Sequence, residues 1–231
     1  MGGLGGVFLD IHHACSFHFK QAQSMNFLTG FTSGLLLITL SELGDKTFFI
    51  GAILAMRHPR KWVFAGVTVA LIVMTILSVW LGQIASFFPQ SYVQAIAIAL
   101  FIGFGLKLLY DASRMSGKET LDGEQAEALE AVEQREKDII AWSARAVVIE
   151  AFTLTFIAEW GDRTQIATIT LASSHNGWGV LIGASLGHAI CAAIAVAFGK
   201  LIAGRISERL ITALGGVLFI GFGILAAIES A

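Results

Sequence analysis

Charged residues are scarce in this chain of 231 residues: they make up 14% of it, whereas hydrophobic residues make up 55%. Soluble domains carry about 25% charged residues. With a mean hydropathy of +0.74, the composition therefore excludes an ordinary soluble domain and indicates a protein with several membrane-spanning segments. Cysteine is also scarce, because Cys15 and Cys191 are too few and too differently placed for a disulfide framework.

The acidic residues are concentrated in one connector. Eight of the 17 lie between Glu119 and Asp138, so the rest of the chain is almost free of charge. This acidic segment, and a net charge of −2, make nucleic acid an unexpected partner. Apolar residues recur in it at helical spacing and predict a short amphipathic helix on the cytoplasmic side: Leu129, Val132, Ile139 and Ile140. It can serve as an acidic antenna for cations or simply as a solvated tether.

One short charged motif occurs twice inside apolar sequence. Residues 41–47 read Ser-Glu-Leu-Gly-Asp-Lys-Thr and residues 158–164 read Ala-Glu-Trp-Gly-Asp-Arg-Thr. Aligning 41–55 with 158–172 gives six identities in fifteen positions, where composition alone would give about one. The chain therefore contains an internal repeat, and each copy carries the charged motif.

The repeat extends beyond the motif. Residues 100–105, Leu-Phe-Ile-Gly-Phe-Gly, return at 218–223. We therefore divide the chain into an amino-terminal tail (1–25), a first three-helix repeat (26–112), an acidic cytoplasmic linker (113–142) and a second three-helix repeat (143–231). We assign no chemistry to the tail or to its histidines at positions 12, 13 and 18.

Each repeat contains three apolar segments, so the predicted fold is an all-α integral membrane protein with six transmembrane helices. A span needs about 20 residues. The six predicted spans are 27–56, 62–86, 91–112, 143–173, 178–203 and 208–228. The first and fourth are too long for one straight crossing, so each either tilts or breaks at its motif glycine, Gly44 or Gly161.

The basic residues of the connectors predict the orientation. Three connectors carry them and two do not: Arg57, Arg60 and Lys61 in the first, Arg114, Lys118, Arg135 and Lys137 in the centre, and Lys200, Arg205 and Arg209 after the fifth span. The positive-inside rule places these three in the cytoplasm and both termini on the opposite side. Because each repeat has an odd number of spans, the two repeats are inverted relative to each other.

The two motifs bring six ionisable residues into the membrane region. On a continuous helix the Glu, the Asp and the base of each motif would lie on one face, at positions i, i+3 and i+4. These residues are Glu42, Asp45 and Lys46 in the first motif, and Glu159, Asp162 and Arg163 in the second. A charge at mid-membrane costs about 2.5 to 3.5 kcal/mol on insertion scales. The charges must therefore be compensated, either as salt bridges that lock the bundle, Glu42 with Lys46 and Glu159 with Arg163, or by a bound ion or protons.

The side chains of the motifs favour a hard divalent cation. Four carboxylates, with possible contributions from Thr47, Thr164 and Gln165, form an all-oxygen set suited to calcium, manganese or magnesium. Zinc or copper would normally recruit Cys or His. His188 lies in the fifth span and is either a packing residue, a residue that tunes manganese against calcium, or a proton relay.

The paired Glu-x-Gly-Asp-Lys/Arg-Thr motifs, one per three-span repeat with an acidic connector between them, resemble the signatures of the GDT1 family (uncharacterised protein family 0016). The resemblance covers about residues 26–229. It implies a secondary active transporter that exports Mn²⁺ and/or Ca²⁺ from the cytoplasm in exchange for protons. Glu42, Asp45, Glu159 and Asp162 would be the cation ligands, with Lys46 and Arg163 as motif bases and no resident cofactor.

Two other classes stay open. A passive divalent cation channel would use the same carboxylates without proton coupling, and an intramembrane phosphatase would need a phosphate cradle that the sequence does not offer. An enzyme is therefore not expected. The chain length resembles prokaryotic family members, which favours a prokaryotic plasma membrane or an internal, thylakoid-type membrane. The preference between Mn²⁺ and Ca²⁺, the proton stoichiometry and the oligomeric state stay open.

Overall fold

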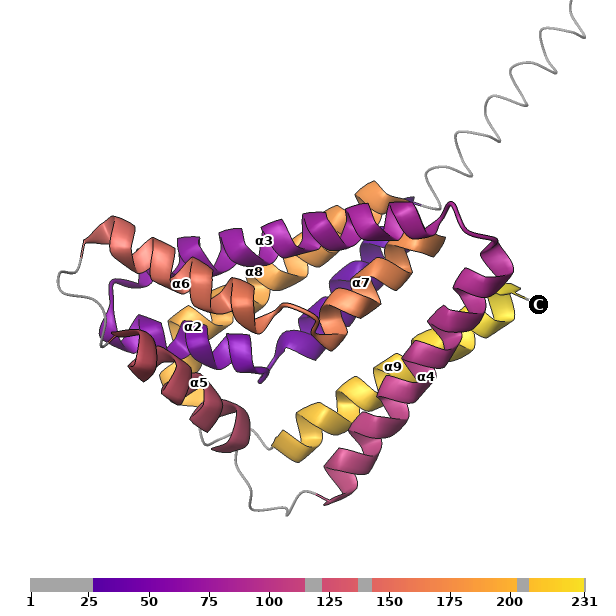
Figure 1. Cartoon of the computed structure of the whole chain (residues 1–231). Helices are drawn as coiled ribbons and strands as arrows, with labels where there is room; N and C mark the ends of the chain where they lie inside the picture. The colour runs from indigo at the N-terminus through magenta and orange to yellow at the C-terminus, as the bar shows by residue number, and fades with distance from the viewer. Residues whose placement is uncertain (1–26, 115–121, 137–142, 203–207, 231) are drawn as a thin grey trace, which may run out of the picture.

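The computed structural model describes residues 27–114, 122–136, 143–202 and 208–230 (Figure 1). In these residues the chain is helical and has no strand. Several residues used in the predictions lie outside the described part of the chain: the amino-terminal tail, Lys118, Lys137, Ile139, Ile140 and Arg205. The expectations that depend on them stay predictions.

The helices follow the predicted spans, with the two motif helices divided. A first helix, Phe27–Glu42, is followed by α2 (Lys46–Arg57), α3 (Arg60–Ala85) and α4 (Gln90–Arg114). The linker contains α5 (Asp122–Glu136). The second repeat contains α6 (Ala144–Ala158), α7 (Arg163–Ser174), α8 (Gly177–Ile202) and α9 (Glu208–Ser230).

Within the described residues three helices are long and apolar enough to cross a membrane: Arg60–Ala85, Ser91–Arg114 and Gly177–Phe198. A fourth span is obtained if Phe27–Glu42 and α2, which meet at an angle of 65°, count as one broken crossing. The described part of the chain is therefore helical and contains three to four candidate membrane spans. The six-span inverted arrangement stays a prediction.

The two repeats pack through equivalent contacts. Gly66 of α3 lies against the carbonyl of Val148 in α6, and Gly183 of α8 lies against the carbonyl of Phe31 in the first helix. Residues 66 and 183, and residues 31 and 148, are each separated by the repeat offset of 117. Neither glycine has room for a Cβ atom, so the same close helix crossing occurs twice, each time between the two repeats.

The helices form two groups. The first helix, α2, α3, α6, α7 and α8 make a bundle, and α4 and α9 run side by side as a separate pair (Figure 1). The pair is held by the repeated Leu-Phe-Ile-Gly-Phe-Gly segments: the ring centroids of Phe101 and Phe219 are 5.9 Å apart, and Gly105 lies against Gly216 and Ile220. The site described below lies in the bundle.

The predicted amphipathic helix in the linker is present as α5, and it packs against α2. Its buried face consists of Ala128 and Val132, both 0% exposed, whereas Leu129, which we expected on that face, is 38% exposed. An ion pair of 3.4 Å joins Glu133 to Arg57 at the end of α2. At least this part of the linker is therefore docked on the bundle.

Candidate cation-binding site

Each motif lies where a helix is interrupted. Gly44 and Gly161 have φ angles of 82° and 81°, and no other described residue has a positive φ. These left-handed glycines let the chain turn, and the amides of Asp45 and Asp162 donate back to the carbonyls of Glu42 and Glu159 at 3.2 and 3.1 Å. Of the two geometries left open by the sequence, the structure has the broken helix.

The second acid of each motif caps the helix that follows. The Asp45 carboxylate accepts a hydrogen bond of 2.9 Å from the amide of Lys46, and the Asp162 carboxylate accepts one of 3.2 Å from the amide of Thr164. The expectation that acid, acid and base share one face of a continuous helix is therefore wrong. Each aspartate begins a new helix, and the break, rather than helical spacing, brings it to the first acid.

The breaks of the two repeats meet. Carboxylate oxygens of Glu42, Asp45 and Asp162 lie within 4.8 Å of one another. An ion pair of 3.3 Å crosses from Arg163 in the second repeat to Asp45 in the first. Glu42 and Glu159 are 2% and 3% exposed. The structure thus gathers three acids of the predicted set around one point and places the fourth, Glu159, beside a small cavity next to it.

The motif threonines orient the two buried glutamates. Thr47 donates a hydrogen bond of 3.1 Å to Oε2 of Glu42, and the Thr164 hydroxyl is shared between Oε2 of Glu159 at 3.3 Å and Oδ2 of Asp162 at 3.1 Å. The second oxygen of Glu42, Oε1, has no hydrogen-bond partner among the described residues. A buried carboxylate oxygen without a donor is a position where a cation or a proton is needed.

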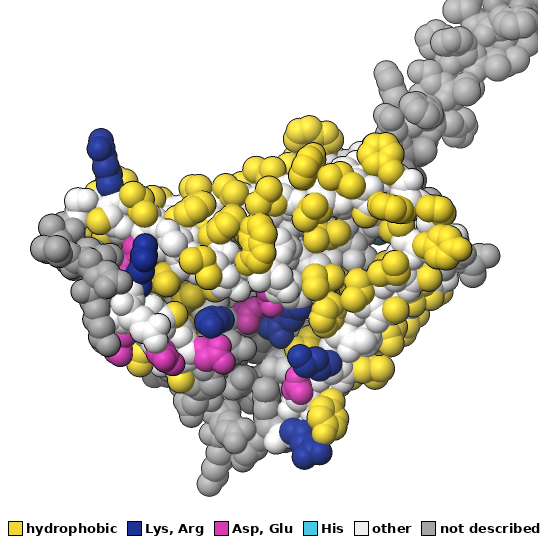
Figure 2. Space-filling model, viewed as in Figure 1, with side chains coloured by type: hydrophobic (Ala, Val, Ile, Leu, Met, Phe, Trp, Pro, Cys, Tyr) yellow, Lys and Arg dark blue, Asp and Glu magenta, His cyan; other side chains and the backbone are white. Residues whose placement is uncertain are grey.

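The motif bases do not pair with the glutamates of their own motifs. Lys46 extends away from the cluster to the exposed Glu127 of α5, at 3.0 Å, and Arg163 pairs with Asp45. The alternative in which Glu42 with Lys46 and Glu159 with Arg163 form local locking salt bridges is therefore wrong. Figure 2 shows acidic and basic side chains gathered near the middle of one face, among apolar side chains.

Two further predicted residues lie at the site in different roles. Gln165 accepts a hydrogen bond of 2.7 Å from the amide of Gly161, so its side chain braces the turn of the second motif. His188 of α8 is 4% exposed, and its Nδ1 lies 3.9 Å from Oε1 of Glu42. The histidine that the sequence left open between packing and function thus lies against the acidic cluster.

Sequence reasoning missed the α3 side of the site. Met74, Thr75 and Ser78 line the cavity beside Glu159, together with Thr168 of α7. A signal was available, because Thr75 and Ser78 are polar where their repeat counterparts, Ala192 and Ala195, are apolar. Comparing the two repeats position by position would have found them.

The turn of the second motif predicts an effect on stability. Gly161→Ala adds a Cβ in open space, but at a φ of +81°, so we expect the free energy of unfolding to fall by about 1 to 2 kcal/mol. Gly103→Ala is the matched control, because that glycine is also free of neighbours within 4 Å but has ordinary helical φ. Thermal unfolding in detergent should separate the two, and equal stabilities would contradict a strained turn.

Comparison with known proteins identifies a similar set of sequences. The family described as "Divalent cation/proton antiporter GDT1" matches residues 30–116 and 147–231. The chain is 56% identical over 200 residues to "GDT1-like protein sll0615" of Synechocystis, covering 86% of this chain and 97% of that protein.

Plant proteins match over a similar part of the chain. The chain is 43% identical to "GDT1-like protein 3" of Oryza sativa subsp. indica, over 83% of this chain and 71% of that protein. It is 40% identical to "GDT1-like protein 5" of Arabidopsis thaliana, over 85% and 94%. No solved structure matches.

Proposed function

The chain belongs to the GDT1 family of divalent cation/proton antiporters, and from this premise we propose that it exports Mn²⁺ and/or Ca²⁺ from the cytoplasm in exchange for protons. Membership makes it a multi-pass membrane transporter of divalent cations rather than an enzyme, which agrees with its apolar helices. The observation that carries the rest is the meeting of the two broken motifs at one cluster of buried carboxylates.

We propose that Glu42, Asp45, Glu159 and Asp162 bind the transported cation. Their oxygens form the hard ligand set that such cations prefer, and the helices that end at Glu42 and Ala158 direct their carbonyl ends toward the same region. Of the two motif bases only Arg163 contacts this acidic cluster. The acids thus need further positive charge, which one divalent cation or protons supply.

The membrane arrangement we propose is six spans in two inverted repeats, with the two broken helix pairs each crossing once. The equivalent contacts of Gly66 and Gly183 support this arrangement. They show that α3 packs on α6 in the same way as α8 packs on the first helix. The acidic linker then lies in the cytoplasm. We place the protein in a prokaryotic plasma membrane or a thylakoid-type membrane.

The separation of the helices into a bundle and the α4–α9 pair suggests how access can alternate. The bundle carries all four acids, and the pair contacts it through α7 and the first helix. Movement of one group against the other, with the carboxylates alternately protonated and bound to metal, would expose the cluster to one side of the membrane at a time. Metal and protons then compete for the same oxygens.

One vesicle experiment separates this function from a channel or a phosphatase. Purified protein in sealed liposomes should move Mn²⁺ or Ca²⁺, tested separately, against the metal's gradient when an opposing pH gradient is imposed. Flux only down the metal gradient, with no effect of the pH gradient, would identify a channel. Release of phosphate from lipid phosphates would identify the enzyme.

The orientation has its own test. In a background with Cys15 and Cys191 replaced, Ala126→Cys on the exposed face of α5 should resist an impermeant thiol reagent added to intact cells. Phe87→Cys, at a residue 88% exposed in the α3–α4 connector, is the matched control and should react. Labelling of Ala126→Cys from outside, with Phe87→Cys protected, would reverse the orientation.

A further inference from the structure

A small cavity lies directly beside the acidic cluster. Its volume is about 10 Å³, the space of about one water molecule or ion. It is bordered by α3, α7, α8 and Glu159, and its lining residues include Met74, Thr75, Ser78, Thr164, Thr168 and His188. Because α7 begins at Arg163 beside the cluster, Thr164 and Thr168 lead away from the acids along that helix.

The hydroxyl groups of this cavity present lone pairs to it. Thr75, Ser78 and Thr168 each donate their proton to the carbonyl four residues earlier in their own helix, at 2.8 Å. A hydroxyl whose proton is engaged can still accept or coordinate through its oxygen. The lining is therefore rich in atoms that attract a positive ion.

His188 supplies a buried nitrogen to the same cavity. Its Nδ1 has no hydrogen-bond partner among the described residues, and neither does Oε1 of Glu42, 3.9 Å away. Both groups are more than nine-tenths buried, so leaving both atoms without partners is costly. Their separation is less than twice the bond lengths of about 2.0 to 2.6 Å that divalent cations make. One ion can therefore satisfy both.

Apart from the motif residues Glu159 and Thr164, the polar lining has apolar counterparts in the other repeat. Four of these pairs, at the offset of 117, are Thr75 and Ala192, Ser78 and Ala195, Thr168 and Gly51, and His188 and Leu71. All four counterparts are buried. If this region served packing alone, apolar residues would suffice at the equivalent positions of both repeats. The polar residues around the cavity therefore indicate a function that only this copy of the region has.

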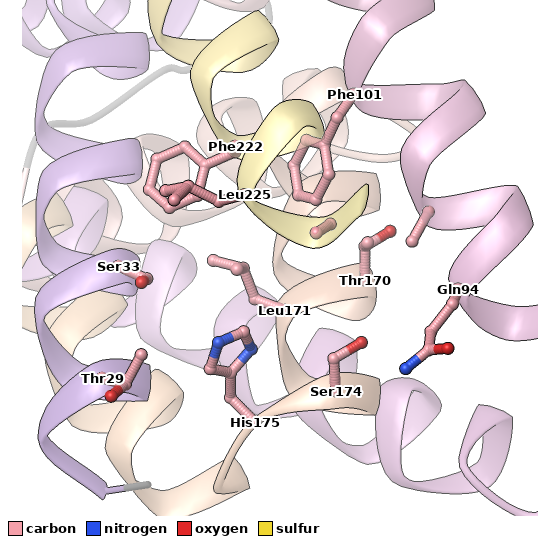
Figure 3. Close-up of a pocket in the computed structure, with 12 residues that line it drawn as sticks. Thr29, Ser33, Gln94, Phe101, Thr170, Leu171, Ser174, His175, Phe222 and Leu225 are labelled. Atoms are coloured by element: carbon pink, nitrogen blue, oxygen red, sulfur yellow. The ribbon is translucent and has the colours of Figure 1, made fainter. Parts of the chain in front are cut away.

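A second cavity lies farther along α7, on the side that faces α4 and α9. Figure 3 shows this cavity, of about 80 Å³, between the first helix, α4, α7 and α9, into which Thr170, Ser174 and His175 project from α7 and its end. Thr29, Ser33 and Gln94 face them from the other helices. Along α7 the small cavity is nearer to the acidic cluster than this second, mainly apolar cavity, which lies against the first helix, α4 and α9 rather than α3 and α8.

We propose that the small cavity is a second cation position, which the ion occupies after it leaves Asp45 and Asp162 while it stays bound to Glu42, and that His188 is its specificity-determining ligand, favouring Mn²⁺ over Ca²⁺. This inference rests on the proposed function. An imidazole nitrogen is a good ligand for transition metals, whereas Ca²⁺ takes oxygen ligands almost exclusively.

The selectivity of transport tests this role. We compare wild type with His188→Gln, which keeps a polar side chain, and His188→Leu, which restores the residue at the repeat counterpart, in liposomes with Mn²⁺ or Ca²⁺ as the transported ion. Both variants should weaken Mn²⁺ affinity at least about tenfold and change Ca²⁺ affinity less than about threefold. An unchanged ratio of the two affinities overturns the inference. Wild type that moves neither metal would instead overturn the proposed function.

A spectroscopic measurement detects the ligand directly. Pulsed electron paramagnetic resonance of the purified protein loaded with Mn²⁺ alone should show coupling to a ¹⁴N nucleus, and His188→Gln should lose it. His175→Gln, in the larger cavity, is the matched control and should keep it. Absence of the coupling in wild type, its persistence in His188→Gln, or its loss in His175→Gln overturns the assignment.

Discussion

Glu42→Gln and Glu159→Gln should each abolish transport almost completely, by at least about a hundredfold. Each glutamate is buried, each is held by the threonine of its motif, and they come from different repeats that meet at one cluster. An amide keeps the shape of the side chain but removes a negative charge that the cation needs. Because the ligand set is shared, losing either glutamate should disable the whole site rather than half of it.

The variants should remain folded, and this separates a binding role from a structural one. Neither glutamate is the ion-pair partner of a motif base, since Lys46 pairs with Glu127 and Arg163 with Asp45. The substitution therefore leaves no base newly unpaired, and it relieves repulsion among buried acids. We expect a thermal midpoint in detergent no lower than that of wild type.

The matched control is Glu130→Gln, which changes an exposed acid of α5 that accepts a hydrogen bond from Gln134 and should transport like wild type. Initial rates of Mn²⁺ and Ca²⁺ uptake in liposomes are the measurement. Partial losses that add in the double variant Glu42→Gln, Glu159→Gln would indicate two independent sites. Loss of monodispersity in the single variants would indicate that the glutamates hold the fold.

Much of the helical architecture could be predicted because the two repeats share identical residues, which is a stronger signal than a shared pattern of hydropathy. The paired charged motifs located the site, and the glycines beside the charges made a break at each motif one of two expected geometries. The choice between them depended on backbone conformation. Gly44 and Gly161 adopt positive φ, and Asp45 and Asp162 act as helix caps, which helical spacing alone could not reveal.

The partners of the charges could not be predicted from the sequence. Local spacing suggested that Lys46 pairs with Glu42, yet it reaches Glu127, 81 residues away, because α5 docks on α2. Arg163 likewise pairs across the repeats with Asp45. Such contacts depend on tertiary packing. The position of His188 against Glu42 could not be predicted for the same reason, and the sequence left this histidine open between packing, metal tuning and proton relay.

Metal binding should release protons, and apparent metal affinity should strengthen as pH rises. The groups that face the cluster are Glu42, Asp45, Glu159 and Asp162, with Arg163 as the cation paired to Asp45 and His188 beside Glu42. Lys46 pairs with the exposed Glu127, so it does not compensate the charge of the acids in the cluster. Without metal, four acids gathered around one guanidinium cannot all stay ionised at low cost, so protons occupy the carboxylates that the metal later uses.

The measurement is proton release on adding Mn²⁺ or Ca²⁺ to purified protein in weak buffer, with affinity determined from about pH 6 to 8. The slope of log affinity against pH should equal the number of protons released, about one to two for each divalent cation, by linkage. The double variant Glu42→Gln, Glu159→Gln is the control and should release none, because a site without both glutamates no longer binds the metal that displaces protons. Wild type that binds either metal with flat affinity across this range and no proton release would mean that the carboxylates hold metal without exchanging protons for it. A proton gradient could then not drive metal through this site, and uniport or channel-like conduction would have to replace exchange as its mechanism.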